Sequence, residues 1–293
     1  MIEIMEPVEP TLLNPEVPAI PEPVFLPPPA PPRQRLWLHA LLFVLTVAST
    51  IWTAGPVFSA GLLSILLAHE FGHYFTARKY RVPVSLPYFI PFPFSLFGTL
   101  GAFIRMSPRI PHRRALFDIA AAGPLAGLVL AIPVAYRGIM LSAVVQKSAV
   151  PPHSISLGEP LLFRGLSWLA HGSMGSNFDL MLHPLAFAGW AGMFVTALNL
   201  LPIGQLDGGH ISHALFGSRS RLVAGSMFGG LALFCLVKQN VTWIPLLLFL
   251  VLFGIQHPRS YYEGPPLDRG RRALGILLGA IFVVCFSLVP IKL

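Results

Sequence analysis

The residues best suited to chemistry are the five from 69 to 73, His-Glu-Phe-Gly-His, which form an HExxH pattern. Residues four apart share one face of a helix, so the imidazoles of His69 and His73 can bind one Zn²⁺ with Glu70 beside them. A carboxylate in that place can act as the general base that takes a proton from the attacking water. The alternative is a pair of histidines that only hydrogen-bond across a polar helix interface.

A catalytic zinc needs a third protein ligand and one open position. Asp207 is our candidate for that ligand, because it ends the run NLLPIGQLD that starts at Asn199. Pro202 and Gly204 interrupt any helix before it, and the glycines at 208 and 209 let backbone approach a metal closely. The competing interpretation is that Asp207 only caps a helix or turn.

These residues lie in a chain that belongs in a lipid bilayer. Of its 293 residues, 54% are hydrophobic and 11% are charged, whereas a soluble domain carries roughly 25% charged residues. We therefore expect an all-α polytopic membrane protein with about six or seven transmembrane helices. The predicted spans cover residues 36–54, 56–76, 115–136, 182–203, 222–237, 242–256 and 273–290. The fifth and sixth are short and could instead form one re-entrant hairpin.

Charge is distributed unevenly along the chain. Residues 1–32 contain five glutamates, many prolines and no lysine or arginine, which predicts a disordered cytoplasmic tail. The transmembrane domain then covers residues 33–293, with a catalytic core at about 56–215 and C-terminal helices at 222–293. A cytoplasmic N-terminus puts fifteen of the twenty lysines and arginines on the inner side, so the net charge of +8 reflects topology and indicates no nucleic-acid partner.

With both motifs in place, the chain resembles the site-2 proteases, the intramembrane M50 family of zinc metalloproteases. The family's NxxPxxxLDG run is matched by Asn199, Pro202, Leu206, Asp207 and Gly208. The resemblance covers about residues 60–215 and includes the runs GTLGAFI at 98–104 and AAAGPLAG at 120–127. It implies one Zn²⁺ per chain and transmembrane protein substrates, and we expect a multi-pass protein of the bacterial cytoplasmic membrane.

The resemblance also bears on Asn199 and on substrate binding. It makes Asn199 a candidate donor to the developing oxyanion or to the substrate backbone, although an interhelical hydrogen bond is an equal alternative. The 45-residue loop from about Arg137 to Met181 is too short for the PDZ domain of many relatives, so we expect a PDZ-lacking type.

Prolines between residues 82 and 106 exclude a continuous helix, which predicts a small re-entrant or β element on the cytoplasmic side near the active site. Its strand can bind an unwound substrate through a free edge, or can be satisfied within the protein. The predicted substrate-binding residues are Gly98, Thr99, Leu100, Gly101, Ala102 and Phe103.

Two other functions stay open from the sequence, a membrane metal transporter and a noncatalytic membrane scaffold. A transporter needs ligands that continue across the bilayer, and a scaffold needs none of the four residues His69, Glu70, His73 and Asp207.

Two further features have plain interpretations. Gly123 and Gly127 form a GxxxG helix-packing motif, and Asp118 either pairs with Arg114 four residues earlier or stabilises a helix start. Neither the substrate's identity nor the oligomeric state follows from the sequence.

Overall fold

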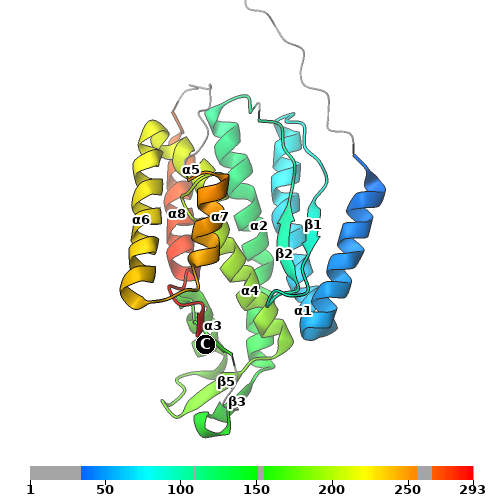
Figure 1. Ribbon diagram of the computed structural model, residues 1–293, viewed down its shortest axis with the longest axis vertical. Helices are drawn as coiled ribbons and strands as arrows, with labels where there is room; N and C mark the ends of the chain where they lie inside the picture. Colours follow the sequence, from blue (N-terminus) through cyan, green and yellow to red (C-terminus); the bar gives the residue numbers. More distant parts are fainter. Residues whose placement is uncertain (1–33, 109, 151–154, 256–265, 293) are drawn as a thin grey trace, which may run out of the picture. The chain divides into compact units, whose positions relative to one another are not determined.

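The computed structural model describes residues 34–108, 110–150, 155–255 and 266–292. The predicted tail, residues 1–32, lies outside them. Figure 1 shows a helical bundle with a short β-hairpin beside it. The predicted all-α architecture with a small β element is therefore confirmed in outline.

Helix α1 (Leu36–Lys79) consists of two segments that meet at Gly55, whose φ of 85° and ψ of 170° lie outside the helical range. Pro56 follows directly, and proline is compatible with the first turn of the second segment. The chain reverses direction there (Figure 1), so that Thr50 Oγ1 lies 2.6 Å from Ser59 Oγ. The break matches the predicted boundary between spans 36–54 and 56–76.

The second segment of α1 packs against α2 (Arg113–Met140) and α4 (Pro184–Asn199), and these three helices hold the main core. Small side chains let the backbones approach closely, because Ala131, Ala135, Ala188 and Ala191 are all fully buried. Larger apolar side chains fill the remaining space, including Phe58 and Trp190. The ligand-bearing helix is therefore held on two sides.

The C-terminal part comprises α5 (Asp207–Phe216), η2 (Gly217–Arg219), α6 (Ser220–Lys238), α7 (Ile244–Phe253) and α8 (Arg269–Cys285). Helix α8 contacts α3, α4 and α5. Its N-cap is Asp268, whose carboxylate accepts a hydrogen bond of 3.0 Å from the backbone N–H of Arg271.

The predicted β element is an antiparallel hairpin of β1 (Tyr88–Pro91) and β2 (Thr99–Phe103), with Tyr88 opposite Phe103 and Phe89 opposite Ala102. It follows the first segment of α1 over much of its length. His39 Nδ1 lies 3.0 Å from the carbonyl of Pro87, and Ser49 donates to the carbonyl of Gly98. Gly98, predicted as part of the strand, lies in the turn just before it.

The loop predicted between about residues 137 and 181 contains regular structure. It holds β3 (Ala143–Gln146), η1 (Lys147–Ala149), β4 (Ser156–Leu157), α3 (Leu161–His171) and β5 (Phe178–Met181). Strands β3 and β5 pair with each other, and β4 pairs with the C-terminal β6 (Ile291–Lys292).

Three stretches are long and apolar enough to cross a membrane within the described part of the chain, namely Leu36–Lys79, Arg113–Met140 and Asp207–Lys238. The chain is thus an integral membrane protein. The predicted count of six or seven spans is not confirmed, because α4, α7 and α8 have only 16, 10 and 17 residues.

Candidate metal centre

The second segment of α1 positions the HExxH residues at its C-terminal end. His69, Glu70 and His73 are 3%, 6% and 7% exposed, so the three side chains point into the protein. The Nε2 atoms of the two histidines lie 3.1 Å apart. This is the spacing expected when residues i and i+4 of one helix face a common point.

Asp207 reaches the same point from a different part of the chain. Helix α4 ends at Asn199, and α5 begins at Asp207. A Cβ atom on the neighbouring Gly208 would lie 2.0 Å from the carbonyl oxygen of Leu200, so only glycine permits this close return. Asp207 Oδ2 consequently lies 3.3 Å from the Nε2 atom of each histidine.

The three candidate ligand atoms fit a tetrahedral zinc. Ligands at about 2.0–2.1 Å from the ion in that geometry are about 3.3–3.4 Å apart. The separations here are 3.1 Å between the imidazoles and 3.3 Å from each imidazole to the carboxylate. Two imidazoles and one carboxylate form the ligand set typical of catalytic zinc, with a fourth position open. Among the described residues, they are the one group of three or more such side chains within reach of a common ion.

Charge also favours a cation at this point. Glu70 is buried and Asp207 is largely buried, so two carboxylates line one pocket with the histidines. Burying carboxylates without compensating charge is costly, and neutral imidazoles supply none. A divalent cation would offset both negative charges and would leave the imidazoles neutral, as metal binding requires.

A backbone group orients one of the two histidines. His73 donates from Nδ1 to the carbonyl oxygen of Ile119 on α2, at 2.7 Å. With the proton on Nδ1, the lone pair of Nε2 is directed to the metal position, which is the usual outer contact of a ligating histidine. No side-chain pattern marks a backbone carbonyl, so sequence inspection could not identify Ile119.

Gly123 and Gly127, interpreted from the sequence as a packing motif, lie directly against the ligands. A Cβ atom on Gly123 would lie 2.1 Å from His73 Nε2, and one on Gly127 would lie 3.3 Å from the Cβ and Nδ1 atoms of His69. The two glycines therefore provide the space that the imidazoles occupy. Their four-residue spacing on α2, equal to that of the histidines on α1, was the available signal.

Asn199 lies at the same site, since its side-chain amide nitrogen is 3.2 Å from His69 Nε2. The pocket around Glu70 is bounded by α2, by the α4–α5 connection and by β2. Of the predicted substrate-binding residues, Ala102 and Phe103 line this pocket. The other four, Gly98, Thr99, Leu100 and Gly101, are not among its lining residues. Gln205 and His210 also line it.

Comparison with known proteins places the chain in a family. Residues 57–237 match peptidase family M50, so the chain belongs to that family. The resemblance seen in the two motifs is therefore confirmed.

Two similar proteins are both named probable zinc metalloprotease EGY1, chloroplastic. The one from Oryza sativa subsp. japonica is 34% identical over 241 residues, which is 79% of this chain and 40% of the relative. The one from Arabidopsis thaliana is also 34% identical, over 79% of this chain and 42% of the relative. This chain thus spans about two fifths of the length of these relatives. A solved structure, the site-2 protease from Methanocaldococcus jannaschii, is similar with a TM-score of 0.37 and 20% identity, covering 79% of this chain and 93% of that one.

Proposed function

We propose that this protein is a zinc-dependent endopeptidase that hydrolyses peptide bonds in or near the transmembrane segments of membrane proteins. One observation carries the proposal. His69, His73 and Asp207 converge at ligand spacing in a buried pocket that also contains Glu70. The names of the relatives, probable zinc metalloproteases, support the same chemistry.

Each residue of the site has a defined task in this reaction. His69, His73 and Asp207 would hold one zinc ion per chain, which would supply Lewis acidity at the scissile carbonyl. Glu70 takes the proton of the attacking water and returns it to the leaving amine. Asn199 is available to donate its amide N–H groups to the developing oxyanion, because its side chain lies beside His69.

Substrate would bind in extended form along β2. A helical substrate hides its carbonyls in intrahelical bonds, so it must unwind before its peptide bond can be attacked. One edge of β2 pairs with β1, and residues Ala102 and Phe103 line the pocket that contains Glu70. Main-chain pairing with the other edge would hold an unwound segment across the catalytic residues.

The membrane orientation belongs to the same proposal. The excess of arginine and lysine in the predicted inner loops favours a cytoplasmic N-terminus and an active site near the cytoplasmic face, in a protein of six or seven spans. The predicted bacterial cytoplasmic membrane gains no support from relatives whose names place them in chloroplasts.

A metal transporter is the less favoured function. It would need further ligand groups along a path through the membrane. In the part of the chain that the structure describes, ligand-type side chains cluster at His69, His73 and Asp207 alone.

The function is tested by quantitative proteomics on membranes that express the wild-type protein or Glu70→Gln. Glutamine keeps the shape of the side chain but cannot accept the proton of water, so uncut membrane proteins should accumulate in the variant. Identical membrane proteomes for the two proteins would contradict a proteolytic function in those membranes.

A further inference from the structure

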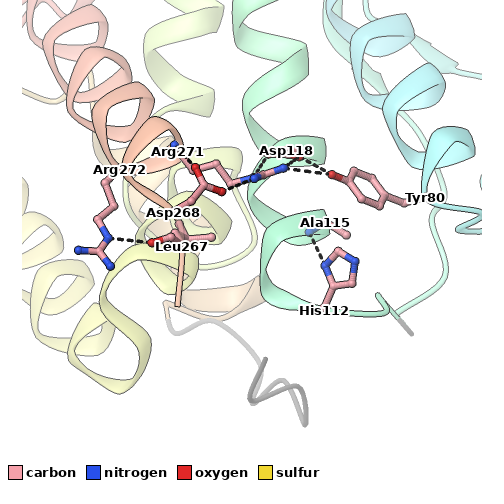
Figure 2. Close-up of polar contacts among 8 residues, drawn as sticks. All are labelled: Tyr80, His112, Ala115, Asp118, Leu267, Asp268, Arg271 and Arg272. Carbon is pink, nitrogen blue, oxygen red and sulfur yellow. Dashed lines mark hydrogen bonds and ion pairs between the residues drawn. The ribbon is translucent and has the colours of Figure 1, made fainter. Parts of the chain in front are cut away.

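The ends of α1, α2 and α8 are joined by one polar cluster, shown in Figure 2, and α1 and α2 both line the pocket of the metal centre. We call Tyr80, Asp118, Asp268 and Arg271 the polar clamp. Tyr80 directly follows α1, Asp118 lies in the second turn of α2, and Arg271 lies in the first turn of α8. The sequence suggested that Asp118 either pairs with Arg114 or stabilises a helix start, whereas its partner in the structure is Arg271, 153 residues away.

The hydrogen bonds within the polar clamp fix the orientation of its side chains relative to one another. Arg271 donates to both oxygens of Asp118, from Nε at 2.8 Å and from Nη2 at 2.6 Å. Such a forked pair fixes orientation as well as distance. The hydroxyl of Tyr80 donates to Asp118, and Arg271 also forms an ion pair with Asp268 at the start of α8.

The protonation states suit these contacts. Burial and the hydrogen bond to Asp118 raise the pKa of Tyr80, so its phenol keeps the proton that it donates. Hydrogen bonds from Arg271 lower the pKa of Asp268, so that carboxyl stays ionised. The side chains of Arg271 and Asp118 are 27% and 23% exposed, so water screens the pair only in part.

The polar clamp includes the residue next in sequence to one that contacts a candidate metal ligand. Asp118 is the residue before Ile119, whose carbonyl accepts a hydrogen bond from His73 Nδ1–H. Helix α2 is weakened close by, because Pro124 has no N–H to donate to the carbonyl of Ala120. The hydrogen bonds that Arg271 and Tyr80 donate to Asp118 add contacts from outside α2 to the turn that presents Ile119.

We propose that the polar clamp is a positioning device for the metal centre, with Arg271 as its key residue. By holding Asp118, Arg271 keeps the Ile119 carbonyl against His73 Nδ1 and thereby keeps His73 Nε2 directed at the metal. Tyr80, at the end of the helix that bears His73, fixes α1 to the same carboxylate. The inference rests on the metal site of the proposed function, but it does not require the substrate to be a peptide.

A purely structural role, in which the polar clamp only fastens α8 to the bundle, predicts different behaviour. It would change unfolding temperature and leave His73 and the metal unaffected. The two roles are separated by measurements on the purified full-length protein. The variants are Arg271→Gln, Asp118→Asn and the double variant, with Arg272→Gln as a matched control, because Arg272 lies on the same turn and donates to the carbonyl of Leu267.

Zinc affinity is measured by competition with a chromogenic chelator. Direct outer contacts of a metal ligand are worth about 10–100-fold in affinity, and the polar clamp acts one step further out, so each single variant should bind zinc about 3–10-fold more weakly. The double variant should lose little more, because both changes break one interaction. Arg272→Gln should bind zinc like the wild type. Tyr80→Phe, which keeps the aromatic ring, should weaken zinc binding to a smaller degree. It is the test variant if the other variants fold poorly.

The second readout is the imidazole of His73, followed by ¹⁵N NMR in metal-free and zinc-loaded protein. The wild type should show the proton on Nδ1, and Arg271→Gln should show that signal shifted or exchange-broadened. Unchanged zinc affinity and an unchanged His73 signal in Arg271→Gln and Asp118→Asn would overturn the proposal, as would an equal loss in Arg272→Gln. If the wild type binds no zinc, the proposed function fails, whereas the His73 signal still decides the role of the polar clamp.

Discussion

At the scale of single residues, the metal centre depends on groups with no catalytic chemistry of their own. The ligands are imidazoles and a carboxylate, but their places are set by Gly123, Gly127 and the carbonyl of Ile119. All three belong to α2, which contributes no ligand. The precision of the site therefore comes from a helix that only contacts the ligand-bearing helix.

This dependence predicts a strong effect for Gly123→Ala. The added methyl would lie 2.1 Å from His73 Nε2, so His73 must move from the metal position. Zinc affinity should fall roughly 5- to 150-fold, because overpacking costs about 1–3 kcal/mol, and the zinc content of the purified protein should fall with it. Zinc analysis of the purified variant provides the measurement.

Gly229→Ala is the control for that substitution. A Cβ at this α6 glycine meets nothing within 4 Å, so zinc content should stay at the wild-type level. Full zinc content in Gly123→Ala would mean that His73 is not a ligand in the orientation described.

Some residues of the site could be identified from the sequence and others could not, for physical reasons. His69, His73 and Asp207 could be identified because rare polar side chains at fixed spacing stand out in apolar segments. The Ile119 carbonyl has no signature in side-chain chemistry. The pair of Asp118 and Arg271 depends on two helices meeting, which local spacing does not encode.

At the scale of elements, the hairpin of β1 and β2 links the first segment of α1 to the pocket. The chain at both ends of the hairpin contacts α1, because His39 Nδ1 lies 3.0 Å from the carbonyl of Pro87 and Ser49 donates to that of Gly98. Ala102 and Phe103 line the pocket at the same time. A strand fixed in this way is rigid enough to present its remaining backbone groups to a substrate.

Proline substitutions test whether substrate pairs with β2. Ala102→Pro and Phe103→Pro each remove one backbone N–H. At one of the two positions that N–H points away from β1, and the proline variant at that position should cleave substrate at least about tenfold more slowly. A loss of about 1.5 kcal/mol in hydrogen bonding corresponds to this effect. Zinc content should remain unchanged. Cleavage at the wild-type rate in both zinc-loaded variants would show that substrate is held elsewhere.

The elements could be predicted where hydrophobic runs are long and are separated by glycine or proline. Gly55 and Pro56 marked the break in α1, and the prolines between residues 82 and 106 marked the hairpin. The stretch 143–181 was interpreted as a loop because its strands have only two to four residues and its helix eleven. These short strands are stabilised by pairing with distant strands, as β4 is by β6, and no local sequence pattern indicates that pairing.

At the scale of the whole molecule, contacts place several chain segments at one end of the bundle. Arg271 at the start of α8 lies 3.4 Å from the Tyr80 hydroxyl. A Cβ on Gly217, between α5 and α6, would lie 3.0 Å from a guanidinium nitrogen of Arg113 at the start of α2. The basic residues predicted to face the cytoplasm thus include several that gather at a single end.

Cysteine labelling tests the orientation of that end. Single cysteines introduced at Arg81, Arg219 and Arg269 should react with a membrane-impermeant reagent only from the cytoplasmic side, because basic loops are retained there. A cysteine near Gly158, at the exposed Glu159, should react only from the opposite side. The two native cysteines are buried, so they should contribute little background. Labelling of the Arg81 and Glu159 positions from the same side would contradict the proposed topology.

The most direct test of the central claim is the zinc content of the purified protein, measured together with cleavage in the same samples. The wild type should contain about one zinc per chain, as a single three-ligand site requires. Glu70→Gln should keep that zinc and lose hydrolysis, and Asp207→Ala should lose both, because its carboxylate lies 3.3 Å from each ligand imidazole. Full zinc content and activity in Asp207→Ala, or normal hydrolysis in Glu70→Gln, would contradict the site described for this protein.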